Sequence, residues 1–410
     1  MSVYITRHLE GAVLEASRHY PVVMVCGQRQ VGKSTLLHHI MEPERRYVTL
    51  DNANARRLAE TDPGLFFEAY PAPLLIDEFQ RVPSLLLEMK RVVDEAALRG
   101  EDNGGMFWLT GSQKFSMMKG AAESLAGRVA VFELSGLSAA EVEGRPAGPF
   151  QPETDAVRER LARCVPKDTR MIYEAIFRGG MPKVIATDID REHYYMDYVN
   201  TYLEKDIKDL SQVGKLREFY DFLVCMAART AQELRYSDIA GAVGVSAPTV
   251  KEWVSILERS GVLFLLRPYH SNITNRIVKM PKAYFMDTGL AAHLCRWPNA
   301  ETLERGAMDG AFLETWAVTE IIKGYLNAGL RPNLYYYRDT DKREIDLLMI
   351  DGERAYPIEI KKSRDPAHAD RHFGVLDRFP LDLRPGLVLC MTPELVPLSR
   401  RAWLCPLSAL

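Results

Sequence analysis

The chain has 410 residues, of which 47% are apolar and 26% charged, and its formal net charge is −3. This composition is that of an ordinary globular protein, and it excludes a polycation that would bind nucleic acid along its whole length. No apolar run approaches the roughly 18 residues of a membrane-spanning helix, and the six cysteines form no C-x-x-C pair. We therefore expect a cytoplasmic protein of roughly two or three domains, without a membrane partner.

The first informative stretch is residues 27–35, an uninterrupted G-x-x-x-x-G-K-[ST] pattern. It follows the apolar run Val22–Cys26 and precedes a helix-like stretch, which is the context that a phosphate-binding loop requires. Lys33 would reach the β- and γ-phosphates of ATP, and the Ser34 hydroxyl would bind Mg²⁺. The predicted nucleotide-binding residues of the loop are Gly27, Gln28, Arg29, Gln30, Val31, Gly32, Lys33, Ser34 and Thr35.

Two carboxylates end the next strongly apolar strand, at Asp77 and Glu78. We expect Asp77 to hold the hydrated Mg²⁺ and Glu78 to polarise the attacking water. The alternative is an acidic pair that caps the following helix, predicted at Pro83–Ala97. That alternative would leave the loop at 27–35 without a metal partner.

Two more polar positions complete the predicted nucleotide site. Ser112 follows the strand Met106–Thr110 and would lie beside the γ-phosphate, although an ordinary polar turn is an equal alternative. Arg128 is the candidate for stabilising charge on the transferred phosphate, from its own chain or from a neighbouring subunit of a homo-oligomer. A surface arginine in a loop is the alternative for Arg128.

Short apolar strands alternate with helical stretches over the first part of the chain, which predicts a parallel three-layer α/β domain at residues 1–143. A Gly/Pro-rich stretch follows, and residues 144–234 read as a helical lid or connector. The loop Arg178–Pro182 within it has no evident purpose. The predicted strands are Val22–Cys26, Tyr47–Leu50, Leu74–Ile76, Met106–Thr110 and Val129–Leu134.

Residues 235–295 have the pattern of a helix-turn-helix followed by a strand, which predicts a winged helix. The two helices are expected at Tyr236–Val243 and Ala247–Ser260, and the charges of the second helix balance. The segment Arg267–Lys282 carries four Lys or Arg residues and no acid. We expect duplex DNA to contact this segment; a solvated basic loop is the alternative.

The last stretch, residues 296–410, contains a predicted β-hairpin with an Asp351-Gly352 turn. On its return strand, Glu359 and Lys361 are two residues apart and therefore share one face. Asp346 lies on the partner strand.

These side chains, together with Glu314 from a preceding helix, predict a site that hydrolyses phosphodiesters. The predicted metal ligands are Glu314, Asp346 and Glu359, and the predicted catalytic groups are Glu359 and Lys361. The alternative is a hairpin with Glu/Lys pairs on a wet face.

The order of these motifs resembles that of prokaryotic AAA-type ATPases with a C-terminal uncharacterised domain. In that family a winged helix is joined to a restriction-endonuclease-like fold, so the resemblance implies ATP binding at the loop and a nuclease-like α/β domain at residues 296–410. One departure from the nuclease motif is Ile345, which stands where proline is expected before Asp346. The resemblance rests on Gly27–Thr35, Leu74–Gln80, Leu109–Gln113, Leu125–Arg128, Arg178–Pro182, Asp287–Gly289, Phe312–Glu314, Arg343–Asp346 and Ile358–Lys361.

Three functions follow from these motifs. The first is an ATPase coupled to duplex DNA through the winged helix and the nuclease-like domain. The second is a nucleotide-dependent signalling switch that acts on a protein partner, which the neutral second helix and the overall acidity favour. The third is an ATP-gated, metal-dependent DNA nuclease.

Overall fold

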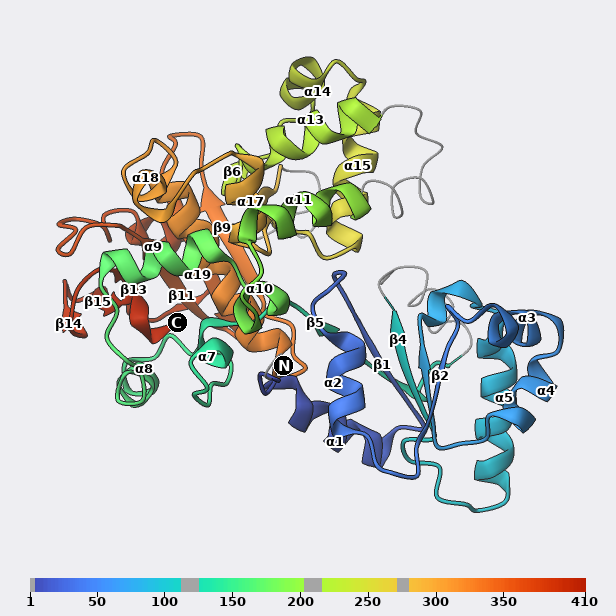
Figure 1. The fold of residues 1–410 in the computed structure, drawn as a ribbon. Helices are drawn as coiled ribbons and strands as arrows, with labels where there is room; N and C mark the ends of the chain where they lie inside the picture. The colour runs from blue at the N-terminus through green and yellow to red at the C-terminus, as the bar shows by residue number, and fades with distance from the viewer. Residues whose placement is uncertain (1–3, 112–124, 203–215, 271–279) are drawn as a thin grey trace.

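The computed structural model describes residues 4–111, 125–202, 216–270 and 280–410. A parallel sheet lies at the N-terminal side, helices form the middle, and a mixed sheet forms the C-terminal side (Figure 1). Among the helices of the described residues, none is both long and apolar enough to cross a bilayer.

The N-terminal unit is built on a five-stranded sheet in the order β2-β3-β4-β1-β5, and every neighbouring pair is parallel. Successive residues of a strand point to opposite faces, so β1 serves two cores. Val23 and Val25 pack in one core, and Val22 and Met24 pack in the other. The strands are β1 (Val22–Gly27), β2 (Arg46–Thr49), β3 (Leu74–Asp77), β4 (Phe107–Gly111) and β5 (Val129–Leu134).

Helices cover both faces of this sheet, which confirms the predicted three-layer α/β arrangement (Figure 1). Two helices lie on one face, α1 (Leu9–His19) and α2 (Lys33–Ile40). The opposite face carries α3 (Ala53–Thr61), α4 (Pro63–Ala69) and α5 (Leu85–Leu98). A short 3-10 turn, η1 (Phe79–Arg81), follows β3.

The middle of the chain is helical as predicted, except at the end of the region 144–234. Residues Gln232–Glu233 form a short strand, β6, because they pair with a later strand of the same region. The loop Arg178–Pro182 separates two helices, and the Gly180 carbonyl accepts a hydrogen bond from the Leu137 amide at 2.7 Å. The helices are α7 (Ala139–Val142), α8 (Thr154–Leu161), α9 (Thr169–Arg178), α10 (Pro182–Ala186), α11 (Arg191–Tyr202) and α13 (Leu216–Ala227).

Two helices at a tight turn follow, α14 (Tyr236–Val243) and α15 (Ala247–Arg259). Gly244 ends α14 in the left-handed conformation, with φ 78°, which glycine adopts without a Cβ clash. The Ser246 side chain then accepts a hydrogen bond from the Thr249 amide and caps α15. Antiparallel strands β7 (Leu263–Leu266) and β8 (Lys282–Phe285) form a three-stranded sheet with β6, and α17 (Thr288–Leu294) and α18 (Ala300–Glu304) come next.

The C-terminal side is a mixed sheet with α19 (Asp309–Leu326) packed against it. The predicted hairpin is confirmed as β10 (Glu344–Asp351) and β11 (Arg354–Ile360), which pair antiparallel. The strands β11, β13 and β15 run parallel. The remaining elements are β9 (Leu334–Arg338), η3 (Phe373–Arg378), β12 (Asp382–Leu383), β13 (Gly386–Cys390), β14 (Val396–Pro397), β15 (Ala402–Pro406) and η4 (Leu407–Ala409).

The helix α19 connects the two sheets. Its 18 residues span about 27 Å at 1.5 Å per residue, and it contacts β5, β11 and α9. Trp316 and Ile321 of this helix belong to the same apolar core as Val23 of the N-terminal sheet and Leu387 of β13. One of the apolar cores therefore extends from the N-terminal sheet to the C-terminal sheet.

Candidate functional site

The phosphate-binding loop connects β1 to α2. Gly27 has φ 148°, and a Cβ at this position would lie 2.0 Å from the Leu134 carbonyl oxygen, so only glycine fits. Gly32 has φ 90° and caps α2, which begins at Lys33. The loop amides and the start of α2 therefore form the anion-binding geometry that the sequence predicts.

Lys33 is buried and lies against its own loop. Its ammonium group donates to the carbonyl oxygens of Gly27 at 3.1 Å and Gln28 at 2.8 Å. Burial lowers the pKa of Lys33 to about 8, and the nearby Glu78 carboxylate opposes this decrease. The ammonium group is thus held where a phosphate could replace the two carbonyl partners.

Asp77, at the end of β3, is the centre of a hydrogen-bond network. Its Oδ1 accepts from the hydroxyl groups of Ser34 at 2.8 Å and Thr110 at 2.6 Å. Its Oδ2 accepts from the Tyr47 phenol at 3.1 Å. Burial, followed by the Asp77 charge, raises the pKa of Tyr47 to about 12, so the phenol keeps the proton that it donates.

Glu78 follows Asp77 in the left-handed conformation, with φ 55°. This conformation is uncommon for a residue with a side chain, and such residues concentrate at functional sites. The Gln80 side-chain amide donates a hydrogen bond to the Glu78 carboxylate. Gln80 therefore fixes the position of the predicted water-polarising group. Ser112, also predicted near the phosphates, lies outside the described residues.

Arg128 does not reach the loop of its own chain. Val129 pairs with Val22 at the start of β1, and Leu134 pairs with Gly27 at its end, so Arg128 lies at the opposite edge of the sheet. The six residues of β5, at about 3.3 Å per strand residue, separate Arg128 from the phosphate-binding loop. Its guanidinium group instead pairs with Asp94 at 2.6 Å. The predicted role of Arg128 within one chain is therefore wrong.

A cavity of about 550 Å³ adjoins the loop. The loop side of its lining includes Gln30, Gly32 and Thr35. The opposite side includes Tyr4 from the N-terminal segment and Pro182 at the start of α10. Its volume is in the range of small-molecule pockets, and its position suits the nucleoside part of a nucleotide.

The C-terminal hairpin brings three predicted residues together. Lys361 Nζ lies 3.2 Å from Asp346 Oδ2 and 2.5 Å from Glu359 Oε2. The Ile360 amide also donates to Asp346 at 2.9 Å. Burial, followed by the Asp346 charge, raises the pKa of Glu359 to about 9. Burial alone would raise the pKa of Asp346, but the ammonium groups of Lys361 and Lys282 hold it below its usual range.

Glu314, on α19, is linked to this cluster by a lysine. Lys282 Nζ lies 3.0 Å from Glu314 and 2.6 Å from Glu344, and the Tyr284 phenol donates to Glu314 at 2.7 Å. Burial raises the pKa of Glu314 to about 7. Among the described residues, no group of three or more Asp, Glu, His or Cys side chains stands close enough together to hold a metal ion.

This geometry corrects the prediction for the basic segment Arg267–Lys282. Lys282 is only 4% exposed and serves as an internal counterion, so it is not available to DNA. Arg267 is exposed. The other two cations of the segment, Arg276 and Lys279, lie outside the described residues.

Comparison with known proteins defines the family. Residues 19–143 match the model of an AAA domain, residues 169–301 match a domain of unknown function (DUF8612), and residues 309–410 match another (DUF4143). The uncharacterized proteins Rv2008c of Mycobacterium tuberculosis and Mb2031c of Mycobacterium bovis are each 30% identical over 355 residues, which cover 85% of this chain and 71% of each relative. The chain belongs to their family. Its N-terminal unit is an AAA domain of the P-loop ATPase type.

Two solved structures are similar to this AAA-family chain at low identity. The Walker-type ATPase PABY2304 of Pyrococcus abyssi is 14% identical, with a TM-score of 0.44, over 71% of this chain and 96% of that one. A single-residue variant of RuvB from Thermotoga maritima is 16% identical, with a TM-score of 0.30, over 63% and 85% of the two chains.

Sequence reasoning missed two residues of the AAA domain and one of the acidic cluster. Tyr47 and Thr110 both contact Asp77 from neighbouring strands. Since the carboxyl ends of parallel strands meet at one edge, the polar residue at the end of β4 was a usable signal for Thr110. Tyr47 is not at a strand end, and Lys282 has no local signal because its partners come from α19 and β10.

Proposed function

We propose that this chain is an ATPase that binds Mg²⁺ and ATP at residues 27–35. The observation that carries the proposal is the contact of 2.8 Å between the Ser34 hydroxyl and the Asp77 carboxylate. In P-loop sites, Mg²⁺ is bound through a hydroxyl oxygen and a carboxylate that lie as close together as these two. The described residues therefore fit the metal, and Mg²⁺, when bound, would neutralise charge on the β- and γ-phosphates.

The chain's own groups would do the rest of the chemistry. Lys33 would exchange its two carbonyl partners for phosphate oxygens. The loop amides would hold the phosphates at the start of α2, and the adjoining cavity would take the nucleoside. Glu78, held by Gln80, would orient the attacking water and accept its proton.

Steady-state hydrolysis and nucleotide binding of two variants test this assignment. Lys33→Ala should lose nucleotide affinity, because it removes the cation that contacts the phosphates. Glu78→Gln should keep nucleotide binding while turnover falls at least about tenfold, because water activation is lost and the metal ligands stay. Glu60→Gln, an exposed glutamate on α3, is the matched control and should behave as wild type. Normal hydrolysis by both site variants would refute the active-site assignment.

The proposal extends to duplex DNA as the working partner of the ATPase. The tight turn between α14 and α15 supports a winged helix, and Lys251 and Arg259 are exposed on α15. ATP hydrolysis should rise when linear duplex DNA is added at low salt, and binding should weaken as salt increases. If ATP is hydrolysed but DNA neither raises the rate nor binds in any nucleotide state, a switch that acts on a protein partner would be favoured instead.

A second candidate activity is metal-dependent hydrolysis of phosphodiesters by a nuclease-like C-terminal domain. It is favoured by the convergence of Asp346, Glu359 and Lys361 on one spot of the hairpin. Nicking of plasmid DNA with Mn²⁺ should disappear in Asp346→Ala and in Lys361→Ala. Glu353→Gln, exposed at the hairpin turn, should retain it. Equal nicking by all variants would identify a contaminating nuclease.

A further inference from the structure

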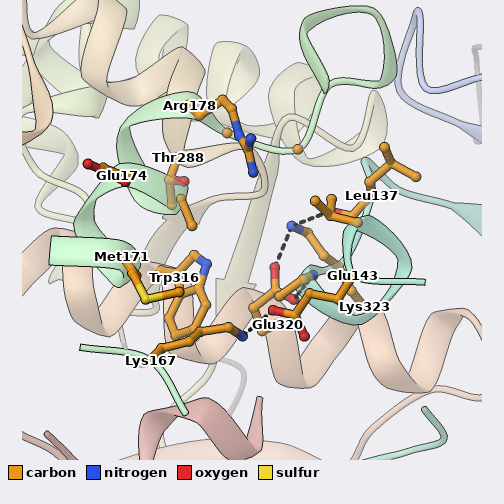
Figure 2. A pocket seen from close by; sticks show the side chains of 15 residues that line it. Leu137, Glu143, Lys167, Met171, Glu174, Arg178, Thr288, Trp316, Glu320 and Lys323 are labelled. Carbon is orange, nitrogen blue, oxygen red and sulfur yellow. Dashed lines mark hydrogen bonds and ion pairs between the residues drawn. The ribbon is translucent and has the colours of Figure 1, made fainter. Parts of the chain in front are cut away.

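A second cavity, of about 420 Å³, lies between the N-terminal unit and α19 (Figure 2). It shares only Leu137 with the lining of the nucleoside cavity. One wall is formed by Arg178, Gly179 and Gly180. These residues begin the loop Arg178–Pro182, for which the sequence suggests no function. A cavity of this volume accommodates a small organic molecule.

Three hydrogen-bond donors line this cavity and have no acceptor among the described residues. They are the guanidinium group of Arg178, the hydroxyl group of Thr288 and the indole N–H of Trp316. Thr288 is only 5% exposed and Trp316 only 4%. Neither the Thr288 hydroxyl nor the Trp316 indole N–H is sealed from solvent, so water or a ligand in the cavity can be its acceptor.

The other charged side chains around the cavity each lie within ion-pair distance of an opposite charge. Glu143 pairs with Lys167 and also with Arg145, whose Nε lies 2.6 Å from the Glu143 carboxylate. Figure 2 shows the Arg178 guanidinium directed into the cavity and the Glu174 carboxylate directed away from it. Arg178 is thus the cation of the lining that has no carboxylate partner among the described residues, and its side chain is exposed. The pairs are Lys323 with Glu320 at 2.8 Å, Lys167 with Glu143 at 2.6 Å, and Arg170 with Glu174 at 2.8 Å.

We propose that this cavity binds a small organic anion and is distinct from the ATP site. The Arg178 guanidinium holds the anionic group in a two-pronged contact, which its planar donors favour. Thr288 and Trp316 donate to further acceptor atoms of the ligand. The apolar body of the ligand packs against the Trp316 ring and the Met171 side chain, which both line the cavity.

The indole N–H signals of ¹⁵N-labelled full-length protein test the proposal. The chain has five tryptophans, and Trp316→Phe identifies the signal of Trp316. Titration with sodium benzoate and, separately, with inorganic phosphate should shift this signal in a saturable way, whereas sodium chloride at equal ionic strength should not. The Trp108 signal, from an indole already bonded to Ser17 at 2.9 Å, should stay in place. A carboxylate ligand predicts tighter binding of benzoate; a phosphate-bearing ligand predicts tighter binding of phosphate.

Arg178→Gln should weaken the binding of these anions by at least about tenfold, since it removes a charge-assisted contact. Arg170→Gln, on the exposed side of the same helix, is the matched control and should bind as wild type. Lys33→Ala should also bind as wild type. The proposal is overturned if neither anion shifts the signal, if Arg178→Gln binds equally well, or if Lys33→Ala abolishes binding and so assigns the anion to the phosphate-binding loop. Failure of ATP hydrolysis would not affect any of these outcomes.

Discussion

Asp77 shows how single side chains prepare a metal ligand. Three hydroxyl groups from three different elements donate to its carboxylate. One of them, on Ser34, belongs to the predicted metal site itself, while those of Tyr47 and Thr110 orient the carboxylate from neighbouring strands. Loss of such an outer contact usually lowers metal affinity by roughly 10–100-fold.

Thr110→Val should therefore weaken the apparent affinity for Mg²⁺ by about tenfold, because Asp77 loses an orienting donor without loss of side-chain volume. The measurement is the Mg²⁺ dependence of ATP hydrolysis at saturating ATP. Thr61→Val, exposed at the end of α3, is the control. An unchanged Mg²⁺ dependence in Thr110→Val would show that the contact has no bearing on the metal.

Arg7 is a second residue with long-range effects. Its guanidinium group pairs with Glu141 at 3.0 Å and donates to the carbonyl oxygens of Val31 at 2.9 Å and Ser135 at 2.8 Å. Both charged side chains are buried. The N-terminal segment, the phosphate-binding loop and the start of α7 thus meet at one cation.

Glu141→Gln should destabilise the protein by about 3–5 kcal/mol, since it leaves the Arg7 charge buried without its partner. Burial opposes ionisation of Glu141, but Arg7 and backbone donors hold its pKa below its usual value of 4.5. This stabilisation is therefore present above about pH 4.5 and is lost as pH falls through the lower pKa of the folded state.

Urea unfolding of wild type and Glu141→Gln at pH 7 and at pH values below 4.5 measures both effects. The difference between the two proteins should shrink as the pH falls. Glu15→Gln, in an exposed pair with Arg18 at 2.9 Å, should change stability by less than about 1 kcal/mol. If the stability difference between wild type and Glu141→Gln instead grows as the pH falls, the predicted direction of the pH dependence is wrong.

At the scale of residues, the sequence predicts the contacts that are local and misses those that are set by distant elements. The loop around Lys33 follows from its motif, and Glu359 and Lys361 meet because they alternate along one strand. Arg128 could have been placed correctly, because the residue before a parallel strand lies at the edge opposite the phosphate-binding loop. Lys282 could not, since its burial depends on α19 and β10.

At the scale of elements, Asp287 connects three segments. Its carboxylate accepts from the Gly180 amide, the Tyr195 phenol and the Leu290 amide, each at 2.7 Å. It therefore caps α17 and also holds the loop Arg178–Pro182 and α11 in place. Asp287 is only 2% exposed, so water cannot easily replace it.

Asp287→Ala should lower the free energy of unfolding by at least about 3 kcal/mol, because three donors lose a buried, charged acceptor. Asn299→Ala provides the matched comparison. Asn299 caps α18 through one contact, to the Thr302 amide at 2.9 Å, and is exposed, so its loss should cost about 1 kcal/mol. Equal costs in denaturant unfolding would show that Asp287 acts as a helix cap alone.

Most elements are predictable from the sequence because their signals are local. The five parallel strands follow from apolar runs, and α14 and α15 follow from Gly244 and Ser246. The strand β6 is not predictable, because two residues acquire strand geometry only through pairing with β8. The domain limits at 143, 234 and 295 remain predictions.

At the scale of the whole molecule, the position of Arg128 bears on assembly. Because its guanidinium group pairs with Asp94 at the far edge of the sheet, Arg128→Ala should leave ATP turnover within about twofold of wild type. A larger loss would point to a role in a neighbouring subunit. Mixing Arg128→Ala with Lys33→Ala would then restore turnover, because one mixed site would contain both native residues.

The two lysines of the C-terminal cluster neutralise buried carboxylates from within the chain. Lys361 lies between Asp346 and Glu359, and Lys282 lies between Glu314 and Glu344. A tethered ammonium group has a fixed effective concentration that does not vary with the surroundings. A divalent ion that enters the cluster must therefore displace a permanent competitor. Half-occupancy would therefore require a higher concentration of free metal, and shortening either lysine would lower that concentration.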